Sequence, residues 1–153
     1  MKLREEQITK KLLMWLENHS WKILAYDFPQ SGTGIILHPN ENIRDSKNKG
    51  GIIPDIIAIK DDVVVFFENK DHYDADDFNK IMMLREANDY SDSISKFLMD
   101  FKYSLILYGV GLPNTQTVKR KSVANIDKID FALLVSEDYQ VEIFHQVKSI
   151  FHL

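Results

Sequence analysis

The amino-acid sequence predicts a single domain of the α/β class, and three observations lead to this prediction. Residues 3 to about 18 carry apolar side chains at helical spacing. Residues 50–70 contain two β-branched, apolar segments on either side of Asp61-Asp62, a pair of turn-forming type. A further apolar segment, 103–110, has the character of a buried strand. A chain of 153 residues is long enough to bury one core of its own.

The first helix is predicted from an apolar stripe made by Ile8, Leu12, Trp15 and Leu16. Glu5 and Glu6 stand in its first turn, where the helix dipole favours anions. Glu5 falls inside the apolar stripe, whereas Glu6 lies about a third of a turn away. Either carboxylate can be a simple N-terminal charge of the helix.

A first strand is predicted at 21–26, followed by a long irregular stretch, 27–51, that is rich in glycine and proline. Residues 33–38 inside it have the pattern of a short strand. Its second half contains three cations, Arg44, Lys47 and Lys49. A loop of this length in a compact domain is usually functional or mobile. Contact with a phosphodiester backbone and a merely solvated loop both remain open.

The segment 50–70 is predicted to be a hairpin with Asp61-Asp62 at its tip. In this register Lys60 lies opposite Val63, and Asp55 lies opposite Glu68. Directly opposed residues hold their Cβ atoms ~4.5–5.5 Å apart, so the two carboxylates should meet at the open end. Side chains alternate along a strand, which puts Lys70 on the face of Glu68 and Asn69 on the other face.

Two opposed carboxylates are costly to place together, because their repulsion destabilises the sheet and tends to raise one pKa. A divalent cation removes that cost. Mg²⁺ is a hard ion that takes one or two protein carboxylates and keeps several waters. Lys70 is then placed to orient a water molecule or to balance charge on a phosphate.

A second helix is predicted from about 75 to 90, starting near Asp74 or Asp76, since aspartate is a favoured cap. We expect it to bury Phe78, Met82 and Leu84, with Met82-Met83 as core filler. Asp71 and His72, just before it, can face a substrate or solvent, and Lys80 is a weaker candidate for phosphate contact. A further short helix is expected within 91–102.

The strand at 103–110 should end at 111–114. Residues 115–125 follow and contain the most basic run of the chain, Lys119-Arg120-Lys121. An exposed loop and a DNA contact are both open for this run. The last strand is predicted at 129–135, with a hairpin partner at 140–145.

The spacing of Pro54-Asp55, twelve intervening residues and Glu68-Asn69-Lys70 resembles the signature of the PD-(D/E)xK nuclease superfamily. The resemblance covers roughly residues 3–110. It implies a restriction-endonuclease-like three-layer core, a central mixed β-sheet flanked by helices in the order αβββαβ. The alternative is an ordinary hairpin with a surface Glu–Lys pair.

The same resemblance implies a set of roles. Asp55, Glu68 and the backbone carbonyl of Asn69 would hold Mg²⁺, for which Mn²⁺ should substitute. Lys70 would position the attacking water. Glu5, with Glu6 as the alternative, would reach the metal directly or through water.

The net charge of −4 argues against a stand-alone DNA-binding module, which usually carries a basic face. The chain resembles the small catalytic subunit of a heterodimeric type II restriction endonuclease, which acts on double-stranded DNA beside a larger DNA-recognising subunit. The alternatives are a homodimeric restriction or structure-specific (Holliday-junction or repair) endonuclease, and a non-catalytic nuclease-fold binding module. There is no cysteine, no apolar run long enough for a membrane span and no signal region, so a cytoplasmic location is expected.

Overall fold

The computed structural model describes residues 2–28, 31–32, 37–38, 40, 51–86 and 89–153. In this part of the chain the strands are β1 (Lys22–Phe28), β2 (Ser31–Gly32), β3 (Ile56–Lys60), β4 (Val63–Asn69), β5 (Leu105–Pro113), β6 (Phe131–Val135) and β7 (Val141–Gln146). The helices are α1 (Glu5–Asn18), α2 (Ala75–Glu86), α3 (Ser91–Phe97) and α4 (Gln116–Val123), with a 3₁₀ turn at Ile126–Lys128. The predicted α/β class is confirmed.

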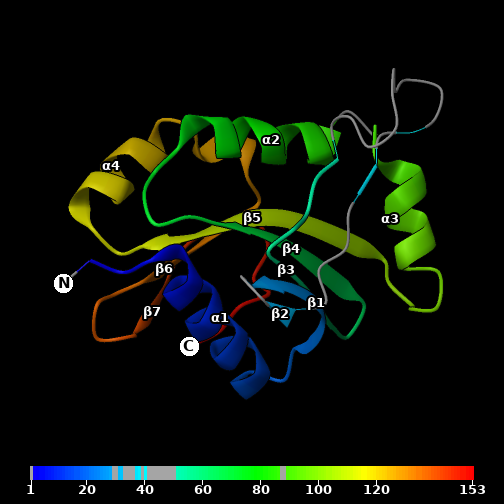
Figure 1. Ribbon diagram of the computed structural model, residues 1–153, viewed down its shortest axis with the longest axis horizontal. Coiled ribbons are helices and arrows are strands. Elements are labelled where there is room, and N and C mark those ends of the chain that lie inside the picture. Colours follow the sequence, from blue (N-terminus) through cyan, green and yellow to red (C-terminus); the bar gives the residue numbers. More distant parts are fainter. Residues whose placement is uncertain (1, 29–30, 33–36, 39, 41–50, 87–88) are drawn as a thin grey trace.

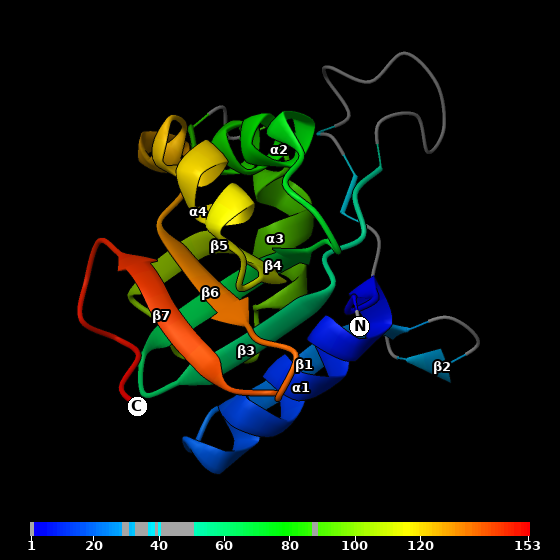
Figure 2. The same ribbon diagram turned by 90° about the vertical axis from the view of Figure 1, so that its left-hand side faces the viewer.

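The strands form one mixed sheet in the order β2-β1-β3-β4-β5-β6-β7. Strands β4, β5 and β6 are parallel neighbours, and the strands on either side of them pair antiparallel. Parallel neighbours need a crossover connection, which α2 and α3 supply between β4 and β5 and α4 supplies between β5 and β6. Helix α1 covers one face of the sheet, and α2 and α4 cover the other (Figure 1, Figure 2).

The predicted hairpin register is confirmed. Lys60 pairs with Val63 and Ile57 with Phe66 in the β3–β4 ladder. The tip residue Asp61 has a positive φ of 54°, a conformation that aspartate tolerates better than most residues. This turn fixes which residues of the two strands face each other at the open end.

Two cores lie on the two faces of the sheet because strand side chains alternate. Phe66 belongs to the core under α2, and its neighbour Phe67 belongs to the core under α1. Residues of β4 with even numbers therefore face α2, and those with odd numbers face α1. This alternation continues into the polar end of the strand.

Helix α2 differs from the prediction in its length and in its buried face. It ends at Glu86, and residues 87–88 lie outside the described part. Phe78 and Leu84 are buried as predicted, but Ile81 takes the core position expected for Met82, which is half-buried. Met83 is 46% exposed and is not core filler. The spacing of Phe78, Ile81 and Leu84 is one of i, i+3 along a single helix face.

Two other boundaries also differ. Strand β5 continues through Pro113, because Gly109 to Pro113 pair with β6. The basic run expected in a loop lies in α4, whose start is capped by Thr115 Oγ1 accepting a hydrogen bond from the Val118 N–H at 3.1 Å. Most of the short strand expected at 33–38 lies outside the described residues, although Leu37 forms an isolated antiparallel bridge with Ile52.

Within the described residues, none of the helices combines the length and the apolar character that a membrane crossing requires.

Gly109 should be required for the packing of β5 against β6, because the backbone and ring of Phe131 leave no room for a side chain there. A Cβ at this position would lie 2.3 Å from the Phe131 carbonyl oxygen and 2.4 Å from its ring, and backbone cannot move aside as a side chain can. We expect Gly109→Ala to lower the free energy of unfolding by about 1–3 kcal/mol, the usual cost of overpacking. Urea denaturation measures this loss. Val123→Ala is the control, since Val123 is 60% exposed; equal midpoints for the two variants would contradict the prediction.

Candidate active site

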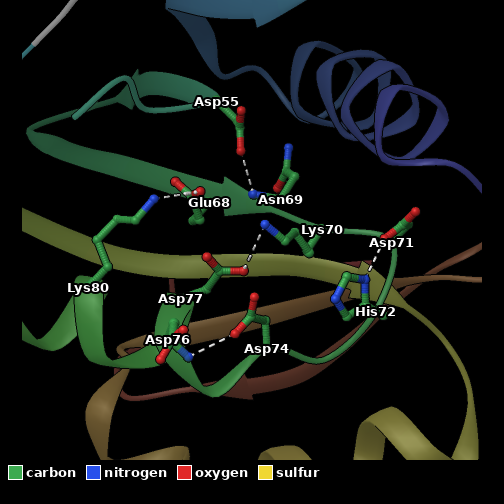
Figure 3. A network of polar contacts seen from close by, with 10 residues as sticks. All are labelled: Asp55, Glu68, Asn69, Lys70, Asp71, His72, Asp74, Asp76, Asp77 and Lys80. Carbon is green, nitrogen blue, oxygen red and sulfur yellow. Dashed lines mark hydrogen bonds and ion pairs between the residues drawn. The ribbon is translucent and has the colours of Figure 1, made fainter. Parts of the chain in front are cut away.

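Asp55 is held immediately before β3 by both its backbone and its side chain. Its N–H donates to the Phe67 carbonyl at 3.0 Å, and its own carbonyl accepts from the Asp27 N–H at 2.9 Å. Its carboxylate Oδ2 accepts from the backbone N–H of Asn69 at 2.7 Å. The side chain is thus fastened across the open end of the hairpin to the end of β4 (Figure 3).

Glu68 and Asn69 point to opposite faces at the end of β4, as the alternation predicts. The Asn69 Nδ2 donates to Thr9 Oγ1 of α1 at 2.9 Å in a buried contact. Glu68 faces α2, where its Oε1 accepts from Lys80 Nζ at 3.0 Å. One residue pair therefore ties the strand end to both helical layers.

Lys70 has its ammonium beside α2. Its Nζ lies 3.8 Å from Asp77 Oδ2, which is beyond hydrogen-bonding distance but close enough for an ion pair. Asp77 stands in the first turn of α2, where the helix dipole favours an anion. Its side chain is 9% exposed. Within the described part of the chain, the ammonium that is hydrogen-bonded to Glu68 is that of Lys80.

Burial and mutual repulsion disfavour ionisation of the acidic pair. Burial raises the pKa of Asp55 to about 8, with the charge of Glu68 adding to the effect and the Asn69 N–H opposing it. Burial also raises the pKa of Glu68, and the Lys80 ammonium opposes this shift. In both carboxyl groups the effect of burial on the pKa therefore outweighs that of the nearby hydrogen-bond donors and cations.

Glu5 lies near this pair. It lines a pocket of about 390 Å³ together with Asp27 and Asp55. Its charge contributes to the raised pKa of Asp55, and its own pKa is raised mainly by burial. Glu6 also borders the pocket, but its Oε1 is paired with Arg4 Nη1 at 2.9 Å. Of the two glutamates, Glu5 is the one coupled to Asp55.

Sequence reasoning missed Asp77 and Asp27, and it did not foresee that Lys80 bonds Glu68. Asp77 and Lys80 lie one turn apart on α2, a spacing that puts both on one helix face. That spacing is visible in the sequence, but it does not reveal that this face points at β4. Asp27 lies near the end of β1. Its backbone N–H donates to the Asp55 carbonyl, and this bond places it beside the pocket.

The six cations suggested for DNA contact do not gather in one place that the structure describes. Arg44, Lys47 and Lys49 lie outside the described residues. Lys119 forms an ion pair with Glu142 at 3.1 Å. Arg120 and Lys121 are exposed on α4, and Lys121 shares a second pocket with Asp71 and His72.

The donor set suits a hard divalent cation. In the described part of the chain, no three His, Asp or Glu side chains are gathered closely enough to hold an ion unaided. Mg²⁺, however, usually takes only one or two carboxylates and completes its octahedron with water and substrate oxygens. Asp55 and Glu68 are two carboxylates of this kind, and they would be the residues to hold such an ion.

No protein-family model, curated protein or solved structure matches this chain.

The raised pKa of Asp55 should make the metal-free protein less stable at alkaline pH. A carboxyl that binds its proton more tightly when folded gives a free energy of unfolding that falls as pH rises between the unfolded and folded pKa values, here from 3.8 to about 8. Asp55→Asn removes this titration and keeps an oxygen for the Asn69 N–H. We therefore expect the variant to gain in Tm over the wild type between pH ~5 and pH ~9 in the presence of a chelator.

Thermal melts followed by circular dichroism measure this difference. Asp76→Asn is the matched control, because Asp76 is exposed on the first turn of α2. If wild type and Asp55→Asn lose stability in parallel over this pH range, the buried carboxyl does not carry the effect.

Proposed function

We propose that this chain is a metal-dependent endodeoxyribonuclease of the PD-(D/E)xK type, built on a restriction-endonuclease-like core. The observation that carries the proposal is the convergence of Asp55 and Glu68 at the open end of one hairpin, with Asp55 bonded to the Asn69 N–H at 2.7 Å. The mixed sheet, the helices on both of its faces and the spacing of Pro54-Asp55 and Glu68-Asn69-Lys70 are all consistent with that class of nuclease. The position of Glu5 on α1, coupled to Asp55, adds further support.

In this proposal Asp55, Glu68 and the carbonyl of Asn69 would hold Mg²⁺, and Glu5 would reach it directly or through water. When bound, the cation would supply a Lewis acid that stabilises charge on the scissile phosphate. Lys70 donates hydrogen bonds that hold the attacking water on the side of α2. The Asn69–Thr9 contact keeps the end of β4 fixed while the substrate binds.

The net negative charge of the chain suggests that it needs a partner protein to bind DNA. The chain carries 23 acidic side chains against 19 lysines and arginines. Lys119 of the basic run is already paired with Glu142. A DNA-binding surface usually places unpaired cations along the phosphates. We therefore propose the role of a strand-cleaving small subunit of a heterodimeric restriction endonuclease, acting on double-stranded DNA selected by a larger subunit.

Removal of Asp55 should abolish metal binding. We expect isothermal titration of Mn²⁺ into the wild-type protein to give binding heat that disappears in Asp55→Ala, because one of the two carboxylate ligands is lost. Circular dichroism should show that the variant remains folded, since its backbone contacts to Phe67 and Asp27 do not involve the side chain.

Asp76→Ala is the matched control for this titration, as it removes a nearby carboxylate that is exposed and leaves Asp55 intact. Equal Mn²⁺ affinity in wild type and Asp55→Ala would refute the assignment of the site.

The isolated chain should retain double-stranded DNA poorly. We expect gel-shift experiments at moderate salt to show weak binding that vanishes as salt is raised, because few phosphate contacts are available. Duplex and four-way-junction DNA should be compared. Tight retention of the junction by the chain alone would instead favour a self-sufficient structure-specific endonuclease.

A further inference from the structure

Helix α2 presents a complementary pair of charges to the end of β4. Asp77 and Lys80 lie one turn apart on this helix, and each meets a group of opposite charge across the layer boundary. Lys80 bonds Glu68 at 3.0 Å, and Asp77 lies 3.8 Å from Lys70 (Figure 3). The four groups form two ion pairs between α2 and the end of the strand that carries the motif.

The Lys80–Glu68 pair is the shorter of the two, at 3.0 Å against 3.8 Å, and it is a hydrogen bond as well as an ion pair. The Glu68 side chain is 13% exposed, while that of Lys80 is 36% exposed. The contact is charge-assisted, which makes it stronger than a neutral hydrogen bond. A carboxylate buried to this degree needs a positive partner, and Lys80 is the cation hydrogen-bonded to it in the described structure.

The ion pair that Lys70 forms is with Asp77 and not with Glu68. Although it shares the strand face of Glu68, its ammonium lies over Asp77, whose Oδ2 is buried and has no hydrogen-bond partner among the described residues. The cation that the motif supplies is therefore engaged by α2, and α2 in return supplies the cation for Glu68.

We propose that Lys80 is the resident counter-ion of the metal site: it neutralises Glu68 in the metal-free protein and gives way to a divalent cation. This inference rests on the proposed function, because it takes Glu68 as a metal ligand. A divalent cation on Glu68 shares that carboxylate with the ammonium, and two positive charges on one carboxylate repel each other. Lys80 then becomes free to donate hydrogen bonds to a phosphate oxygen at the same end of the sheet.

The exchange can be measured without any DNA, by titrating Mn²⁺ into Lys80→Met. Loss of the competing ammonium should tighten Mn²⁺ binding by about tenfold, the effect of relieving a modest like-charge repulsion. Lys128→Met is the matched control: it removes the same charge, and Lys128 also bonds α2, at Asn79 Oδ1 (2.8 Å). Its Mn²⁺ affinity should equal that of the wild type. Lys70→Met should change the affinity less than Lys80→Met does.

Thermal melts give a second readout that a merely structural lysine would not reproduce. Without metal, Lys80→Met should melt below Lys128→Met, because Glu68 is left without its partner. Saturating Mn²⁺ should close that gap. A gap that persists at saturation would show a structural ion pair and would overturn the proposal.

The titrations separate two kinds of failure. If the wild type binds Mn²⁺ and Lys80→Met binds it equally or more weakly, the counter-ion role is wrong and the proposed nuclease site stands. If neither protein binds Mn²⁺, both the metal site and the counter-ion role are wrong. Binding by Lys80→Met alone would support the proposal, since it would show that the ammonium blocks the site.

Discussion

The hydrogen bond from the Asn69 N–H to the Asp55 carboxylate is the contact on which the arrangement of the site depends. It closes the open end of the β3–β4 hairpin, so that Asp55 stays beside Glu68 despite their repulsion. Asn69 can make this bond because its side chain is anchored to Thr9 on the opposite face. A single residue therefore connects α1, the sheet and the acidic pair, and the position of α1 also brings Glu5 within range of Asp55.

The acidic pair could be predicted from the sequence because its geometry is local. The turn at Asp61-Asp62 fixes the register, and a strand period of two fixes the face of each side chain. The same argument assigned Asn69 and Glu68 to opposite faces. These are short-range consequences of backbone geometry.

The contacts of α2 could not be predicted in this way. Phe78, Ile81 and Leu84 pack against the sheet, and this packing sets which face of α2 points toward β4. It depends on contacts between residues that are far apart in the sequence. Lys80 and Asp77 reach the site only through that packing. The basic run was misplaced in a loop for a different reason: its three cations conceal the helical spacing of the buried residues Val118 and Ser122.

The charges at the end of β4 show how two carboxylates, Asp55 and Glu68, can lie close together at one strand end of this fold. Two half-buried carboxylates would destabilise the sheet if no cation were near. Helix α2 supplies one ammonium to Glu68 and draws the second, Lys70, to Asp77, so the strand end stays ordered. Among the described residues no ion pair is formed by Asp55, and its burial, with the charge of Glu68, raises its pKa to about 8. Asp55 lines the same pocket as Glu5 and Asp27, so three acidic side chains border one cavity at this end of the sheet.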